Sequence, residues 1–422
     1  MAFNFDNLWS FYTKACAAAG IILFLEEKER TTTLKVYQKF CQLFFSLFVF
    51  SQAYTLATQY TDLTVVIIAG AGLVIFVAVA TGPIQLIRNH DNFMAIIQWC
   101  RALHKNGQHF HPTLRQFTAN HLNVAGHKSM KIMKIFTYLL AFDGLATTIL
   151  FTTLANLLPI GDLLLEKYHP PFPFDVPFHS AAIWESFLIN LVVQTLGIVN
   201  GTLLGNAVMS IYCVIFIHLL AFLDVILTAV ENFNDSLKRK FRKEFFEMDT
   251  IEEFDQILGE IGEDCEWDDE GIKEHIKIIV DMCSEFNDQL EKFSDLSSPI
   301  FLAWEFTSLF TTFICGIILL LERQHFILSL GVLMANIFFF AICLVNDLIL
   351  DKISKINDGL YNLPWYFMKP SERRMVLMAK STFNVQVGFT AGGIHDLNLE
   401  QFKSITEVAI SNCLALKTLA EQ

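Results

Sequence analysis

The sequence predicts an all-α polytopic membrane protein with seven transmembrane helices. Of the 422 residues, 53% are hydrophobic and only 17% are charged, and the mean hydropathy is positive, so the chain has more apolar surface than a soluble fold hides. Several charge-free stretches are long enough to cross a bilayer. Lys and Arg residues gather in alternate loops between these stretches, which is typical of membrane proteins.

Six stretches have the length that a transmembrane helix requires, about 20 apolar residues. They are residues 40–61, 63–87, 135–158, 186–223, 299–321 and 326–346. The fourth is roughly twice as long as the bilayer requires, so we expect its helix to project beyond the membrane. The short link between the fifth and the sixth predicts a helical hairpin.

The seventh candidate, residues 397–420, is more polar than the others, because Glu400, Lys403, Glu407 and Lys417 interrupt it. A helix of this kind either lies on the membrane surface or crosses with its polar side facing protein or water. The residues alone leave both readings open. The second reading makes it a pore-lining helix.

The distribution of Lys and Arg predicts the orientation of the helices. Residues 88–134 are rich in both, and residues 238–243 read KRKFRK, whereas the loop between the third and fourth stretches contains only Lys167. Loops rich in Lys and Arg remain in the cytosol. Loops 88–134 and 230–297 are therefore predicted to be cytosolic, with the N-terminus cytosolic and the C-terminus extracellular. Most of the net charge of −13 comes from residues 244–274 and does not alter this prediction.

The N-terminal stretch 17–25 is apolar but too short to span, and we expect an amphipathic or re-entrant helix in the inner interface. The chain shows no phosphate-binding glycine loop and no hydrolase or metalloprotease motif, so we expect no enzyme activity and no cofactor. No nucleic-acid partner is expected. The spacing of the clustered histidines fits no common metal site; they are His104, His109, His111, His121 and His127.

Two acids fall inside predicted spans, Asp143 in the third and Glu305 in the fifth. A carboxylate inside a membrane requires a partner, a neutral form or nearby water. Each acid therefore either faces an ion path and tunes gating, or is hydrogen-bonded between helices or reaches the interface. The sequence does not decide between these alternatives.

The stretch 358–381 has the composition of a soluble segment. Pro370 and Ser371 ahead of Glu372 predict the start of a helix. The helix would carry an apolar stripe that contains Met375, Met378, Ala379, Thr382 and Phe383. Such a stripe in the cytosol needs a protein partner, which is either the long fourth helix or a neighbouring subunit.

The C-terminal order of motifs resembles that of the insect odorant receptors. Tyr361 is followed by Trp365–Tyr366, then by an amphipathic helix, by TAGG at 390–393, and by LEQF at 399–402. The related gustatory receptors share the architecture but usually carry Gln-Phe at the end of the last helix. Here Gln401–Phe402 stands at its start, which favours the odorant branch.

The resemblance implies a ligand-gated, non-selective cation channel, opened by a small hydrophobic volatile and located in the plasma membrane of olfactory sensory neurons. Its subunits form a heterotetramer around one pore, and this chain resembles a ligand-tuning subunit that assembles with a shared co-receptor. Membrane lipids and permeating cations are the other expected partners. A gustatory-type channel, a metabotropic receptor and a transporter are the alternatives.

Three regions follow from the resemblance. Residues 1–346 would contain the interfacial helix, the first six membrane helices and an outer-half ligand pocket. Residues 347–396 would form a cytosolic anchor between subunits, with Tyr361, Trp365, Met375, Met378 and Phe383 as its contact residues. Residues 397–422 would form the pore-lining helix and a short tail, with the gate at Ala415, Thr418 and Leu419.

The ligand pocket is expected among the second to sixth helices. Residues at the right depth in these helices, many of them aromatic, are Leu73, Phe76, Thr147, Phe151, Thr195, Val199, Asn200, Phe310, Met334 and Phe338. The abundance of phenylalanine suits an aromatic or heteroaromatic odorant, which would bind mainly by apolar contact.

Overall fold

The computed structural model describes residues 3–18, 20–21, 24, 29–58, 63–105, 118–135, 138, 184–245, 269–321, 326–382 and 388–420. Within these residues the chain is helical apart from short turns and one two-stranded sheet. The all-α class predicted from the sequence is therefore confirmed. Most of the third predicted span, residues 135–158, lies outside the described residues.

The first half of the chain forms α1 (Phe5–Ala18), α2 (Thr32–Thr58), α3 (Leu63–Arg88) and α4 (His90–Lys105). The second half begins with three long helices, α6 (Trp184–Phe245), α8 (Asp269–Leu321) and α9 (Phe326–Tyr361). It ends with a 3-10 turn η3 (Trp365–Phe367), α10 (Pro370–Thr382), β1 (Thr390–Ala391), β2 (His395–Asp396) and α11 (Leu399–Ala420).

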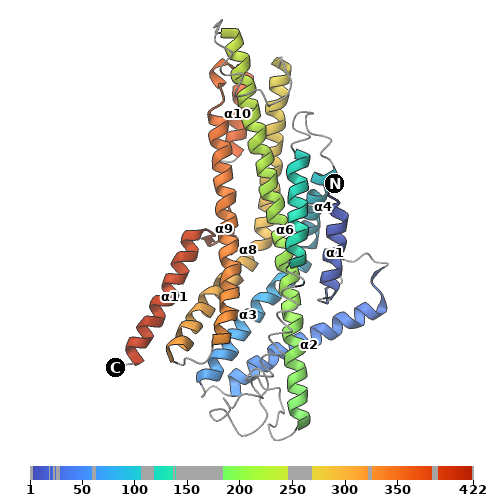
Figure 1. The fold of residues 1–422 in the computed structure, drawn as a ribbon, viewed down its shortest axis with the longest axis vertical. Coiled ribbons are helices and arrows are strands. Elements are labelled where there is room, and N and C mark those ends of the chain that lie inside the picture. The colour runs from blue at the N-terminus through green and yellow to red at the C-terminus, as the bar shows by residue number, and fades with distance from the viewer. Residues whose placement is uncertain are drawn as a thin grey trace.

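The long helices α6, α8 and α9 pack on one another and run along the long axis of the molecule (Figure 1). At about 1.5 Å per residue, the 62 residues of α6 extend about 93 Å, or about three times the hydrocarbon thickness of a bilayer. The helix that contains the fourth predicted span, α6, is thus even longer than the sequence predicts. The helix α10 lies at one end of this bundle, and α11 packs on α8 and α9 and ends near the opposite end.

An aromatic cluster joins the long helices to the C-terminal region. Phe216 of α6, Phe293 and Phe301 of α8, and Phe389 ahead of β1 are all buried. The ring of Phe389 lies 5.4 to 5.8 Å from the other three ring centroids. Aromatic pairs at this distance add favourable edge-to-face contacts to the burial of apolar area. The segment before α11 is therefore part of the core.

The N-terminal helix lies earlier in the chain than expected. The prediction of a helix over 17–25 is wrong, because α1 ends at Ala18 and Gly20 adopts a left-handed φ of 81°. The Gly20 N–H donates to the Ala17 carbonyl at 3.0 Å, which is a helix-ending turn. The buried face of α1, which includes Phe5 and Tyr12, packs against α4 and α6.

Two of the described helices, α2 and the 192–238 portion of α6, are by length and composition apolar enough to cross a membrane. A third qualifies if α3 and α4, which bend by 82° at a short break, are counted as one broken span. One face of α2 carries exposed apolar side chains at helical spacing, namely Val36, Phe40, Leu43, Leu47 and Phe50.

Candidate functional site

The junction between the C-terminal hairpin and α11 is the best-defined polar site in the described part of the chain. The strands β1 and β2 pair antiparallel, and both glycines of the turn have left-handed φ values, 62° at Gly392 and 71° at Gly393. The Gly392 N–H donates to the Ser298 carbonyl of α8 at 3.0 Å. A Cβ at Gly392 would lie 2.7 Å from Leu302 Cδ2, so the turn also needs glycine for its close approach to α8.

Two adjacent side chains of α9 hold the segment that precedes α11. Asn346 is buried; its Nδ2 donates to the Leu397 carbonyl, and its Oδ1 accepts from the Phe389 N–H at 2.9 Å. Asp347 Oδ2 accepts from the Leu399 N–H at 3.1 Å. A carboxylate at the start of a helix satisfies an unpaired N–H and interacts favourably with the helix dipole. The first residue of α11 is therefore fixed to α9.

Glu305 of α8 fixes the first turn of α11 from the other side. Its side chain is 7% exposed, and its Oε1 accepts from Gln401 Nε2 at 3.0 Å. Its Oε2 is buried with no hydrogen-bond partner among the described residues. Of the alternatives that the sequence left open, the structure shows the hydrogen bond between helices. Asp143 lies outside the described residues.

Beyond its first turn, α11 has two sides that differ in burial. Phe402, Ala409 and Cys413 face α8 and α9; Phe402 packs on Phe339 at 5.9 Å, and Cys413 Sγ lies 3.1 Å from the Phe313 carbonyl. The opposite face leaves Val408, Ile410 and Leu414 about half exposed, at 49, 50 and 55%. The side of α11 that faces away from α8 and α9 is therefore uncovered in the single chain, and it is mixed, because exposed Lys403 and Glu407 lie on it with these apolar residues.

The predicted gate residues lie in the last turns of α11. Ala415 and Thr418 are exposed, and Thr418 Oγ1 donates to the Ala415 carbonyl at 2.8 Å. The backbone of Leu419 is helical, but its side chain lies outside the described residues. Ala415 and Leu419 are one helical turn apart, so both positions lie on the same side of α11.

The helix α10 begins at Pro370, as predicted, and the Glu372 carboxylate accepts from the Lys369 N–H at 2.9 Å. The predicted apolar stripe divides into two faces. Ala379 is buried and Met375 is half-buried, whereas Met378 is 59% exposed. In the described residues α10 packs mainly on α8 and α9. The long fourth helix, α6, was one of the two partners that the sequence left open, and it is not the main one.

Several large apolar side chains around α10 remain exposed. Tyr361 is 64% exposed, Trp365 45%, Tyr366 59%, Leu377 64% and Met378 59%. We call this set the anchor patch. The remaining predicted contact residue of this region, Phe383, lies outside the described residues. Large exposed apolar side chains around one short helix are typical of a binding interface.

The predicted ligand residues separate into two places. Phe76 packs on Phe48 at 4.8 Å, and Asn200 Nδ2 donates to the Cys41 carbonyl at 2.9 Å, so these two lie where α2, α3 and α6 meet. Half-buried residues on the same helices are Leu73, Thr195 and Val199. The junction is tightly packed, because a Cβ at Gly201 would lie 2.4 Å from Phe76 Cε1.

The other described candidates belong to α8 and α9. Phe338 packs on Trp304 at 5.7 Å, and Phe310 is 39% exposed, so neither lies with Asn200. Thr147, Phe151 and the side chain of Met334 lie outside the described residues.

Sequence reasoning missed one buried polar residue farther along α2. Gln52 of α2 is fully buried, and neither atom of its amide has a hydrogen-bond partner among the described residues. Asn200 Oδ1 is also buried without a partner. Buried amides are normally paired, so each unpaired group favours a ligand or water beside it. The two groups lie at different levels, because Asn200 contacts Cys41 whereas Gln52 lies beside Gly72 of α3, 11 residues farther along α2. A glutamine in a charge-free span was the available signal.

Two of the histidines form a direct pair. The Nε2 atoms of His104 and His218 lie 3.0 Å apart, and His218 Nδ1 donates to the Val214 carbonyl at 2.7 Å. The His218 Nε2 therefore accepts and His104 Nε2 donates. Within the described residues no group of three or more potential metal ligands exists, and His109 and His111 lie outside them.

Comparison with known proteins agrees with this architecture. The fold is similar to the insect olfactory receptor OR5 from Machilis hrabei, with a TM-score of 0.71 and 12% identity over 97% of each chain. The OR5 structure in complex with eugenol matches with a TM-score of 0.72 and 12% identity over 98% of each chain. No curated protein matches the sequence. The family model described as 7tm Odorant receptor matches residues 87–410, well over half of the chain. This chain therefore belongs to the odorant receptor family, whose members are receptors rather than enzymes.

Proposed function

We propose that this chain is the ligand-tuning subunit of an odorant-gated, non-selective cation channel. It assembles with the shared co-receptor into a heterotetramer in the plasma membrane of olfactory sensory neurons. Family membership and the likeness of the fold to OR5 support an odorant receptor role. In this proposal the seven spans are α2, α3, residues 135–158, α6, α8, α9 and α11, with the N-terminus in the cytosol.

The observation that carries the channel proposal is the division of α11. Its first turn is held by Glu305 and Asp347, whereas farther along the helix Val408, Ile410 and Leu414 are uncovered. This uncovered side also carries exposed Lys403 and Glu407, so it suits neighbouring protein and water rather than lipid. Related subunits arranged around one axis would supply that neighbour and would place α11 along a pore. Ala415, Thr418 and Leu419 are the proposed gate.

The anchor patch supports assembly at the opposite, cytosolic end. It lies on the connection from α9 to α10, so a contact there holds the segment that leads into α11. Burial of its tyrosines, tryptophan and leucine against another subunit would stabilise the assembly, since aromatic residues dominate the energetics of interfaces.

The ligand site is proposed at the meeting point of α2, α3 and α6. OR5 has been solved in complex with eugenol. For this chain we propose a small volatile that makes apolar contact with Phe76 and donates a hydrogen bond to the unpaired Asn200 Oδ1. Apolar contact provides about 25 cal/mol per Å² buried. Binding that favours the open arrangement would shift the equilibrium toward it.

The experiment compares Asn200→Ala with Thr202→Ala during current recording with the co-receptor. Thr202 lies on the same helix, and its hydroxyl donates only to the Ile198 carbonyl of its own helix, so it is the matched control. Removal of one ligand hydrogen bond is expected to shift odorant potency about tenfold for Asn200→Ala, with conductance unchanged. Unchanged potency across an odorant panel would remove Asn200 from the site.

A metabotropic receptor requires the opposite orientation. An accessible extracellular tag at the N-terminus would contradict the topology proposed here. A transporter would show accumulation of a solute rather than current that follows the cation gradient.

A further inference from the structure

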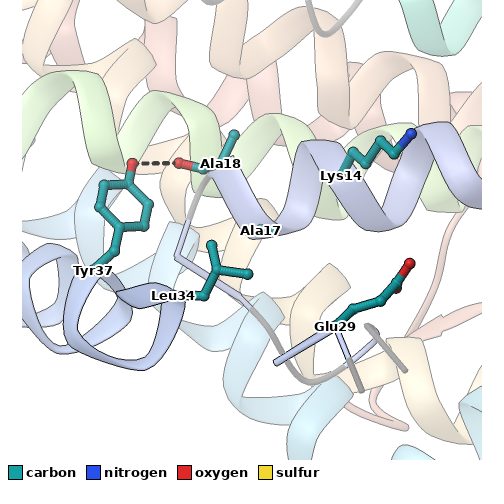
Figure 2. A pocket seen from close by; sticks show the side chains of 6 residues that line it. All are labelled: Lys14, Ala17, Ala18, Glu29, Leu34 and Tyr37. Carbon is teal, nitrogen blue, oxygen red and sulfur yellow. Dashed lines mark hydrogen bonds between the residues drawn. The ribbon is translucent and has the colours of Figure 1, made fainter. Parts of the chain in front are cut away.

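A depression of about 410 Å³ lies between the end of α1 and the start of α2 (Figure 2). Its lining consists of Lys14, Ala17, Ala18, Glu29, Leu34 and Tyr37. The Tyr37 hydroxyl donates to the Ala18 carbonyl at 2.7 Å and ties the two helices together at one end. The depression is open to the surroundings and mostly apolar, and it shares no lining residue with the α11 junction or the proposed ligand site.

Two side chains of opposite charge line this depression, Lys14 and Glu29. Figure 2 shows the side chains of Lys14 and Glu29 at the same end, far from Tyr37 and on opposite sides of the space. Within the described residues, neither side chain forms an ion pair or a hydrogen bond. An ammonium and a carboxylate on opposite walls are complementary to a molecule that carries both a negative and a positive group.

The exposed face of α2 continues from the depression. Phe40, about one helical turn after Tyr37, begins the part of this face that continues with Leu43, Leu47 and Phe50, and these four are 36 to 56% exposed. Residues 40–61 carry no charge, and α2 is long and apolar enough to cross a membrane. The depression therefore lies where the charged start of α2 meets its apolar, membrane-compatible part. A molecule with its polar head in the depression would lay its chains along this face.

We propose that the depression binds the headgroup of a zwitterionic phospholipid of the inner leaflet. The phosphate lies near Lys14 and the ammonium near Glu29, while the acyl chains follow Tyr37 and the exposed face of α2. A purely anionic headgroup places uncompensated negative charge beside Glu29, so it fits less well. The bound lipid would fill the space between α1 and α2 and fix their relative position. The inference rests on the membrane placement of α2, but it does not depend on channel activity.

The test uses the full-length receptor in nanodiscs with a photoactivatable phosphatidylcholine whose reactive group is in the acyl chain. A photoactivatable phosphatidylglycerol is the anionic arm. After irradiation, mass spectrometry locates the labelled peptides. We expect labelling of the first half of α2 by the zwitterionic probe, and weaker labelling there by the anionic one.

Two variants remove the binding determinants. Lys14→Glu places two acids at the depression, and Leu34→Trp fills it. The control is Lys39→Glu, which reverses an exposed charge on α2 outside the lining. Since an exposed charge contact contributes about 1 kcal/mol, labelling should fall about fivefold in Lys14→Glu and remain unchanged in the control. Leu34→Trp should reduce it similarly. If Leu34→Trp does not fold, Lys14→Glu and the comparison of the two probes still test whether the depression binds the headgroup.

Equal labelling of the three variants and the unchanged receptor would overturn the proposal. Equal or stronger labelling by the anionic probe would overturn the choice of a zwitterionic headgroup. Because labelling needs no gating, a receptor that binds the lipid but gives no odorant current would refute the proposed function and leave this inference intact.

Discussion

Removal of the contact between Glu305 and Gln401 should change the opening equilibrium of the channel. Gln401 Nε2 lies 3.0 Å from Glu305 Oε1, and the carboxylate is 7% exposed. A hydrogen bond to a charged group contributes about 1.5 to 3 kcal/mol. If α11 moves away from α8 on opening, the contact stabilises the closed state, and its loss should raise the ratio of open to closed channels by about 10- to 150-fold.

The assay is a double-mutant cycle of Glu305→Leu, Gln401→Leu and the double variant. Each is expressed with the co-receptor, and basal current and odorant dose response are recorded. Each single variant should raise the basal current, and the double variant should add little, because both remove the same bond. Lys403→Met is the control, since Lys403 is 74% exposed and, within the described residues, forms an ion pair only with Glu407, at 3.7 Å.

A different outcome would refute the reasoning. If the two single effects simply add, with a coupling energy below about 0.5 kcal/mol, the side chains do not act together. A basal current that falls in both variants would mean that the bond stabilises the open state instead.

Three further predictions concern the assembly, the hairpin and the pore. Met378→Asp should dissociate the tetramer while leaving the monomer folded, because Met378 is 59% exposed. Native gel electrophoresis checks this with Ser381→Asp as the control, and intact tetramers would contradict the prediction. Gly392→Ala should lower the melting temperature more than Gly393→Ala. In both variants the left-handed φ costs about 1 kcal/mol, but only a Cβ at position 392 would contact Leu302. Equal melting temperatures of the two variants would contradict this reasoning. Ala415→Cys should react with an extracellular thiol reagent and block the current, and an unblocked current would remove this position from the pore.

Several of the helices were largely predictable because their signal is local. Residues 40–61 and 326–346 lie mostly or wholly within α2 and α9, since a charge-free run of this length also has the backbone requirements of a helix. The extension of α6 to Phe245 was underestimated, because hydropathy stops at the first charge, although charged residues such as Asp224 and Lys238 are compatible with a helix in water.

The contacts at the start of α11 could not be predicted from the sequence, for a different reason. Glu305 could be flagged as a buried acid, but its partner Gln401 lies 96 residues away, and nothing in the local pattern connects them. Asn346 and Asp347 had no distinguishing signal at the end of a span. The ligand residues were chosen by depth alone, which fixes the height of a residue in the membrane but not the face of its helix. This is why exposed Phe310 was grouped with buried Asn200.

The central claim is that this chain forms an odorant-gated cation channel with its co-receptor. The most direct test is current recording from cells that express the chain with and without the co-receptor while a panel of volatiles is applied. We expect at least one volatile to evoke a current carried by both sodium and potassium, only when both subunits are present, and persisting in excised patches without GTP. A response that requires GTP, or no response although both subunits reach the surface, would contradict the claim.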